Sequence, residues 1–119
     1  MKEFELKDSG KRQEFETGAV RDTNEGKGRF DLITPYALFR LALVYEKGCK
    51  KYNDHNWEKG IPTSRCIDSA LRHINQYRMG FIDEDHLAHA IWNLCAIIHF
   101  GEMIEKGWLP KELDNAIYK

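Results

Sequence analysis

The densest group of reactive side chains lies in residues 83–93, which read DEDHLAHAIWN. His86, His89 and Asn93 recur at spacings of three and four, so they share one face of a helix that is apolar elsewhere. A polar stripe on a buried helix requires partners, which predicts that it faces a cavity, a metal ion or the polar stripe of another helix. Three acids precede the stripe and are candidate metal ligands: Asp83, Glu84 and Asp85. Helix capping needs only one or two acids, so a site is favoured over the alternative of a purely structural network.

A second polar stripe runs through Asp68, Arg72 and Asn75, again at spacings of four and three. Arg72 is a candidate phosphate ligand, although an ion pair with Asp68 on the same helix explains it equally well. His73 lies nearer the apolar side of this helix, so it is expected to be partly buried and to need a hydrogen-bond partner.

Glu46 lies on the apolar face that Phe39, Ala42 and Leu43 form on an earlier helix. A carboxylate beside apolar surface requires a cation, and a divalent metal with hard oxygen ligands such as Mg²⁺ is one candidate. The alternative is an exposed ion pair with Lys50, one turn later.

Basic and aromatic side chains follow one another at the end of that same helix. Their types suit a pocket for a phosphate and a base: Lys50, Lys51, Tyr52, Asn56 and Trp57. The lysines have an alternative role, since cations at a helix C-terminus interact favourably with the helix dipole. Lys27 and Arg29, in the glycine-rich loop of residues 21–32, are further candidate phosphate ligands.

The elements that must position these residues are mainly helices. Apolar spacing and end signals predict one helix from Pro35, a second from Thr63 or Ser64 to Met79, and a third from Asp83 or Asp85 to Lys106. The expected buried stripe of the first helix is Leu38, Leu41, Ala42, Tyr45, Cys49 and Tyr52. That of the second is Ile67, Ala70, Leu71, Ile74 and Tyr77.

The third helix is apolar nearly all round, which predicts a central position and a core completed by self-association. Residues 1–33 lack helical periodicity; they are expected to be extended or looped, with a hairpin around Glu14–Val20. A short helix is expected after Pro110. The prediction is a single all-α domain spanning 1–119, in which residues 34–119 form the helical core.

Composition excludes several classes of function. A net charge of −1 argues against broad nucleic-acid binding, and the apolar run Leu87–Phe100 is too short and too polar for a membrane span. The first residues lack the apolar core of a signal peptide, so a cytoplasmic location is expected. Cys49, Cys66 and Cys95 are expected to be buried free thiols.

The chain resembles a known enzyme family in four blocks that occur in the same order: ETGAVRDTNEGKGRFDLI, YEKGCKKYNDHNWEKGIP, DSALRH and DEDHLAHAIWN. It is similar over about residues 16–100 to the phage and prophage domain named for dATP/dGTP diphosphohydrolases, which is akin to MazG-like enzymes. The resemblance implies a MazG-like bundle of three to four helices in a homo-oligomer. It also implies a hydrolase that uses Mg²⁺, or Mn²⁺, to convert dATP or dGTP to the monophosphate and pyrophosphate.

MazG-like enzymes pair Glu-x-x-Glu on one helix with Glu-x-x-Asp on another, and this chain departs from that pattern. Glu46 matches one acid of the first helix, but Leu43 and Cys49 stand three residues on either side. The Asp83–His89 region replaces the second pair.

The resulting mechanism has Glu46 and the acids at 83–85 holding the metal against the phosphates. His89 or His73 positions or deprotonates water, while Lys50, Lys51, Arg72 and the Lys27–Arg29 loop neutralise phosphate charge. The incomplete acidic pairs favour an alternative, a non-catalytic protein that sequesters a nucleotide. A third reading is an interaction module whose central helix is buried by self-association.

Overall fold

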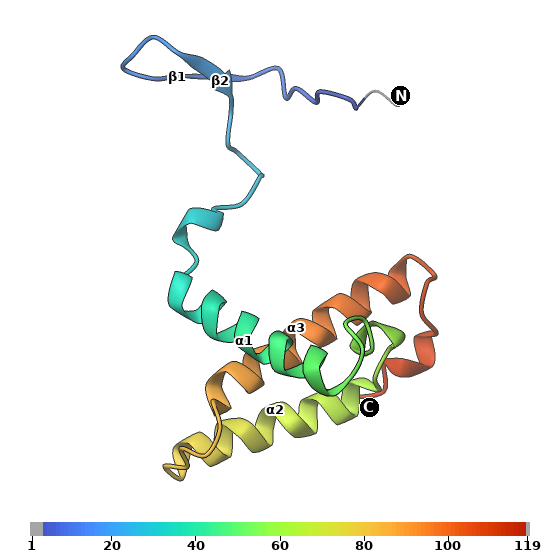
Figure 1. The fold of residues 1–119 in the computed structure, drawn as a ribbon. Helices are drawn as coiled ribbons and strands as arrows, with labels where there is room; N and C mark the ends of the chain where they lie inside the picture. The colour runs from blue at the N-terminus through green and yellow to red at the C-terminus, as the bar shows by residue number, and fades with distance from the viewer. Residues whose placement is uncertain (1–3, 119) are drawn as a thin grey trace. The chain divides into compact units, whose positions relative to one another are not determined.

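The structure, a computed structural model, describes residues 4–118 of the chain. The chain divides into two compact units, Met1–Ile33 and Thr34–Lys119 (Figure 1).

The N-terminal unit contains one small hairpin. Strand β1 (Arg12–Glu14) pairs antiparallel with β2 (Val20–Asp22), with Arg12 opposite Asp22. Gly18 has a φ of 87° in the connecting turn, a conformation that L side chains rarely adopt. The hairpin lies around the predicted Glu14–Val20 segment, and the unit ends with the short 3-10 helix η1 (Phe30–Leu32).

The second unit is helical, which confirms the all-α prediction. Helix α1 spans Pro35–Lys51, α2 spans Thr63–Arg78 and α3 spans His86–Glu105. Two further 3-10 helices, η2 (Trp57–Lys59) and η3 (Lys111–Leu113), lie in the connecting and C-terminal segments.

The helix ends follow the predicted signals, with two differences in how they are capped. The side chain of Asp85 accepts a hydrogen bond from the Ala88 amide and caps α3 as expected. Thr34 precedes Pro35, and a threonine there could cap α1, but its side chain makes no such bond. The Ser64 amide of α2 is instead bound by the side chain of Asn115, 51 residues away, at 3.0 Å.

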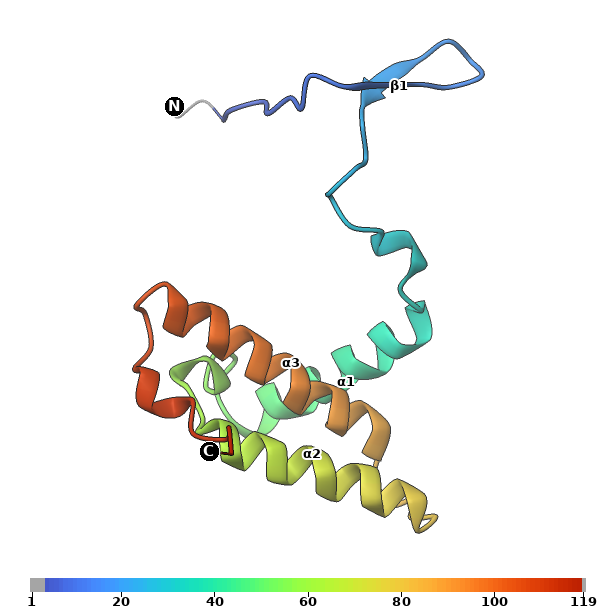
Figure 2. The same cartoon turned by 180° about the vertical axis from the view of Figure 1, so that it is seen from behind.

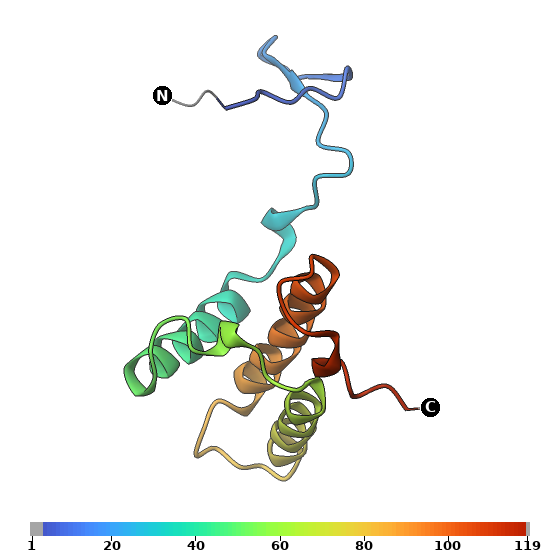
Figure 3. The ribbon, with the colours of Figure 1, turned by 90° about the vertical axis from the view of Figure 1, so that its right-hand side faces the viewer.

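Helix α3 is the central element, as its all-round apolar sequence predicted. It contacts both α2 and α1, and α2 lies along it in every view (Figures 1, 2 and 3). The core is small and centres on Cys66, Ala96 and Phe100. Half-buried residues pack around it: Trp57, Ile61, Trp92, Ile97 and Leu109.

The predicted buried stripes of α1 and α2 are partly wrong. On α2, Leu71 is 62% exposed and Tyr77 55%, whereas Thr63, Cys66, Ala70 and His73 are buried. Small side chains on the inward face let α2 approach α3 closely, and His73 gains a polar partner there. The largest apolar side chains of α2 therefore lie outside the face that packs on α3. Helix α1 has no buried residue, and Leu38 is 60% exposed.

The cysteines are free, but only one is buried. Cys66 lies in the core, Cys95 is half-buried and Cys49 is exposed, so the expectation of a buried thiol was wrong for Cys49. Burial raises the pKa of the Cys66 thiol.

One helix in residues 4–118, α3, is long and apolar enough by length and composition to cross a membrane. This is weak support for a membrane span, because the core helix of a soluble protein passes the same test. Its buried His86 and Asn93 are bonded within the helical unit.

Candidate functional site

Three histidines meet between α2 and α3. The Nδ1 atoms of His73 and His86 lie 2.9 Å apart, and both residues are buried, with 5% and 2% of their surface exposed. The ring of His89 stacks on that of His73 with centroids 4.8 Å apart and an interplanar angle of 18°. The sequence placed His86 and His89 on one face of α3, and the structure shows that this face meets His73.

The hydrogen bonds determine where the protons lie in this group. Asp83 Oδ1 lies 2.8 Å from His86 Nε2, and that bond holds the pKa of the Asp83 carboxyl below its usual range. An ionised carboxylate only accepts, so His86 donates from Nε2 and, when neutral, presents a lone pair at Nδ1. His73 Nδ1 then donates to it. Burial, followed by the neighbouring His89 and Arg72, lowers the pKa of His73, which favours this neutral arrangement.

Asn93 continues the polar face of α3 one turn beyond His89. Its Nδ2 donates to Ser69 Oγ at 3.2 Å and to the His89 carbonyl at 2.9 Å. Arg72 also donates to Ser69 Oγ, at 3.3 Å, so Ser69 joins the two residues that the sequence singled out. Sequence reasoning missed Ser69, although it lies four residues before His73 and so shares its face.

The three acids before α3 have three different partners. Asp85 forms a two-bond ion pair with Arg40 of α1 at 2.7 and 2.5 Å, and Arg40 is the main reason that its pKa is lowered. Asp83 binds His86, as described above. Glu84 Oε1 lies 3.8 Å from His89 Nε2, and its side chain is 45% exposed.

Glu46 lies apart from these acids. Its side chain is 63% exposed, and its carboxylate lies 3.7 Å from Lys50 Nζ, which is the exposed ion pair that the spacing allowed. Arg40, the partner of Asp85, lies six residues before Glu46 on α1, so the two positions are about 9 Å apart along the helix axis. Among the described residues, the group of side chains close enough to share a metal ion contains Glu84 but not Glu46.

A cavity of about 500 Å³ lies between the end of α1, the following loop and α3. Lys51, Tyr52, Asn56 and Trp57 line it, and so does His89 of α3. These residues were predicted separately as substrate-binding and catalytic candidates, and the fold brings them to one cavity. Lys50 is not among the residues that line it.

The cavity wall also contains two aromatic residues that the sequence did not indicate as site residues. Tyr45 lies with its ring centroid 5.7 Å from that of Trp57, and Trp92 lies 6.3 Å from Trp57. Trp92 follows His89 by three residues, so helical spacing could have placed it on the same face. Burial raises the pKa of Tyr45.

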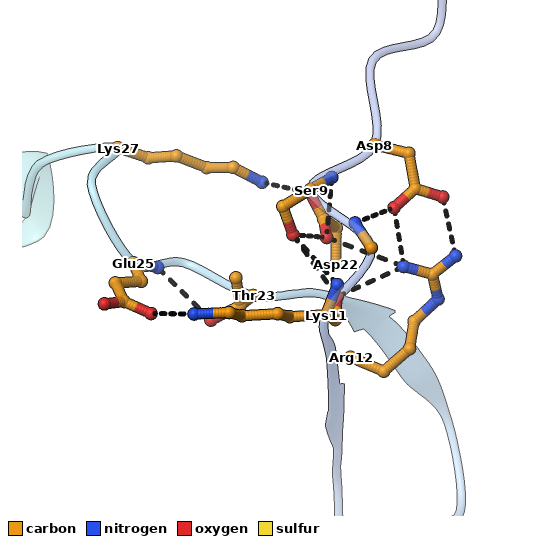
Figure 4. Close-up of polar contacts among 9 residues, drawn as sticks. Asp8, Ser9, Lys11, Arg12, Asp22, Thr23, Glu25 and Lys27 are labelled. Atoms are coloured by element: carbon orange, nitrogen blue, oxygen red, sulfur yellow. Dashed lines mark hydrogen bonds and ion pairs between the residues drawn. The ribbon is translucent and has the colours of Figure 1, made fainter.

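The loop candidates Lys27 and Arg29 lie in the N-terminal unit, where acids neutralise them. Lys27 Nζ lies 3.1 Å from Asp22, whose carboxylate also bonds Ser9 (Figure 4). Arg29 pairs with Asp31 at 2.8 Å. Both cations, together with Arg21, line a second hollow within this unit.

Comparison with known proteins gives one match. The family model described as "dATP/dGTP diphosphohydrolase, N-terminal" matches residues 17–107, which include both histidine helices and the cavity. No curated protein and no solved structure matched the chain. The extent of the family match shows that this chain belongs to the dATP/dGTP diphosphohydrolase N-terminal domain family.

Proposed function

We propose that this chain binds a deoxynucleoside triphosphate, dATP or dGTP, together with Mg²⁺ and hydrolyses it to the monophosphate and pyrophosphate. The cavity carries the proposal, because it places aromatic rings, lysines and a histidine around one space of a size suited to a small ligand. Family membership supports the substrate class. The activity would belong to phage-related nucleotide metabolism in the cytoplasm of a bacterial or infected cell.

The aromatic wall is suited to a purine base. Trp57 and Trp92 are half-buried and contact each other, so this part of the wall is formed before a ligand binds. Tyr52 is 55% exposed and can close over a bound base. Stacking on such rings contributes about 1–3 kcal/mol per base in proteins that bind single-stranded nucleic acids.

Two lysines at the end of α1 supply positive charge to the cavity. Lys47 and Lys51 line it, and Lys51 Nζ lies 5.5 Å from the centroid of the Tyr52 ring. The two charges would neutralise phosphates beside the aromatic wall. The other candidate substrate-binding residues remain predictions: Lys50, Arg72, Asn93 and the Lys27–Arg29 loop.

His89 is the histidine that reaches the cavity. In the proposed reaction, a water oxygen attacks the α-phosphorus, the bond from that phosphorus to the bridging oxygen breaks, and pyrophosphate leaves. His89 accepts the proton of the water, and Glu84 at 3.8 Å helps to orient its ring. His73 is bonded to His86 and acts by stacking on His89.

The donor set for Mg²⁺ fits in part. Mg²⁺ is commonly held by one or two carboxylates together with substrate phosphates. Of the acids at 83–85, Asp83 and Glu84 could do this, because their side chains are 65% and 45% exposed and each keeps an oxygen that is free of a guanidinium. Both oxygens of Asp85 bind Arg40, and Glu46 pairs with Lys50. Mg²⁺ bound there would offset negative charge on the phosphates.

A second candidate function is sequestration of a nucleotide without hydrolysis. The exposed Glu46–Lys50 pair favours it, because the described chain does not place the acid of α1 opposite those of α3. A sequestering protein would need the aromatic cavity and lysines, but not His89 as a base.

The test is an assay of pyrophosphate release with each of the four dNTPs and Mg²⁺, run beside a binding measurement from quenching of the protein's tryptophan fluorescence. Release with dATP or dGTP supports hydrolysis. Tight binding without release supports sequestration. The absence of both would overturn the two functions and leave the interaction module.

Variants separate the roles of the residues. Lys51→Ala should weaken nucleotide binding about tenfold or more, by loss of a charge-assisted contact, whereas Lys111→Ala, outside the cavity, should not.

His89→Gln should lower turnover about 100-fold or more while leaving binding within a few-fold. Unchanged hydrolysis in Glu46→Gln would exclude Glu46 as a metal ligand.

A further inference from the structure

The buried histidine pair between α2 and α3 offers nitrogen ligands that the proposed Mg²⁺ site does not use, although the two sites share the carboxylate of Glu84. One ligand atom from each of His73, His86 and Glu84 lies within 4.8 Å of the other two. The two histidines come from different helices and are 13 residues apart, so the tertiary fold brings them together.

We propose that His73, His86 and Glu84 bind a transition metal ion of the Zn²⁺ class, with water as a fourth ligand. The set consists of two imidazole nitrogens and one carboxylate oxygen. Three protein ligands of these types with one open position are typical of Zn²⁺ sites that retain a water molecule.

The distance between the two Nδ1 atoms favours this assignment. In the described state one proton lies between them, at a separation of 2.9 Å. Two nitrogens that bind one tetrahedral Zn²⁺ at ordinary bond lengths lie about 3.3 Å apart. The two nitrogens therefore need to separate by a few tenths of an ångström, and the rings must turn so that both lone pairs point at the ion instead of at each other.

The proton balance requires no other reactant. His86 already presents a lone pair at Nδ1, because its Nε2 donates to Asp83. His73 must transfer its proton from Nδ1 to Nε2 through solvent, which keeps the ring neutral and frees its Nδ1 lone pair. Glu84, half-exposed at the start of α3, would swing from His89 toward the metal.

Asp83 would be a positioning residue. A carboxylate that accepts from the far nitrogen of a ligating histidine fixes the tautomer and the ring orientation. The 2.8 Å contact between Asp83 Oδ1 and His86 Nε2 has this geometry. The same histidine therefore has both a metal-facing nitrogen and an oriented second nitrogen.

Ligand chemistry separates this ion from the Mg²⁺ of the proposed function. Imidazole nitrogens suit Zn²⁺, Co²⁺ or Ni²⁺, whereas Mg²⁺ prefers oxygen and retains several waters. A large excess of Mg²⁺ should therefore leave the histidine site occupied.

The experiment titrates the whole chain, carrying Cys49→Ser, with Zn²⁺ and with Co²⁺ in the absence of nucleotide. The Cys49→Ser change removes the exposed thiol as a competing ligand. We expect one ion per chain, with the visible absorption of tetrahedral Co²⁺ and no displacement by excess Mg²⁺. Affinity is measured by competition with a chromophoric chelator.

Four variants test the assignment. Glu84→Gln should bind Zn²⁺ more than about tenfold more weakly, and Asp83→Asn about 10- to 100-fold more weakly. His73→Gln should lose the Co²⁺ absorption. His55→Ala removes a histidine whose side chain is 81% exposed and should match the parent.

Unchanged affinity in Glu84→Gln and Asp83→Asn, or no Zn²⁺ binding by the parent, would overturn the proposal. If circular dichroism shows that His73→Gln is unfolded, the Zn²⁺ affinities of Glu84→Gln and Asp83→Asn alone test the proposal, because both positions are exposed. Because metal binding is measured without nucleotide and hydrolysis by pyrophosphate release, either proposal can fail while the other holds.

Discussion

At the residue scale, Asn93 illustrates how one buried amide organises the interface between α2 and α3. Only 5% of its surface is exposed, and its Nδ2 bonds both Ser69 of α2 and the His89 carbonyl of its own helix. It therefore ties α2 to the turn of α3 that presents His89 to the cavity.

Asn93→Ala should lower the free energy of unfolding by about 1–3 kcal/mol, since it removes both bonds and leaves buried groups less satisfied. Urea unfolding followed by circular dichroism measures the change. Asn75→Ala, on the exposed side of α2, should stay within about 0.5 kcal/mol of the parent. Equal losses in the two variants would contradict this role for Asn93.

His55 allows a pH prediction away from the histidine cluster. Its Nδ1 lies 2.9 Å from Glu58 Oε1, and this hydrogen bond raises the pKa of His55 above 6.5. Because the folded-state pKa is the higher one, the stabilisation is fully present below pH 6.5 and is lost as pH rises through the folded-state value.

NMR titration of the His55 ring should therefore give a pKa above 6.5, and Glu58→Gln should move it down. The other four histidines provide internal references in the same spectra. A His55 pKa that Glu58→Gln leaves unchanged would show that the contact is not formed in solution.

At the element scale, the Arg40–Asp85 pair joins α1 to the start of α3. Asp85 performs two tasks, since its carboxylate accepts from Arg40 and also from the Ala88 amide as a helix cap. The pair fixes the N-terminal end of α3, from which His86 and His89 project.

Asp85→Ala should cost more stability than Arg40→Ala. The ion pair is partly exposed, with side-chain exposures of 52% and 33%, so solvent screens it and losing it should cost little stability. Losing the cap as well should add about 1 kcal/mol to the cost in Asp85→Ala. Asp85→Asn retains a capping oxygen and should resemble Arg40→Ala in urea unfolding. A loss in Asp85→Asn as large as in Asp85→Ala would contradict the separate cap contribution.

At the scale of the whole molecule, α3 exposes an apolar stripe that the other described elements of the helical unit do not cover. The stripe has spacings of four, three and four residues, and its side chains are 37–68% exposed: Leu87, Ile91, Leu94 and Ile98. This is the spacing at which two helices pack along a shared seam. We propose that a second copy of the chain covers the stripe, as the apolar sequence of α3 predicted.

Leu94→Glu should therefore convert a dimer or larger oligomer to a monomer, because it places a charge in the seam. Size-exclusion chromatography with light scattering measures the mass. Ile117→Glu adds the same charge at a position that is 72% exposed outside the stripe and should leave the oligomer intact. A monomeric parent protein would refute self-association.

The sequence alone determined the helices, their limits and the family, because these depend on local signals. A helix begins after Asp85, which caps the α3 backbone, and helices end before Gly80 and Gly107, whose φ angles are positive. The four sequence blocks identify the family without knowledge of the fold. The histidines and acids of residues 83–93 could also be placed on one helix end from their spacing.

Only the tertiary structure decided which faces meet. The side of α2 that packs on α3 carries Cys66, Ala70 and His73 instead of the larger apolar residues, because close approach and a partner for a buried imidazole outweigh apolar area there. The same packing aligned two Nδ1 atoms from different helices and gathered the end of α1, Trp57 and His89 around one cavity. These contacts join residues far apart in the chain, and spacing along a single helix carries no information about its partner.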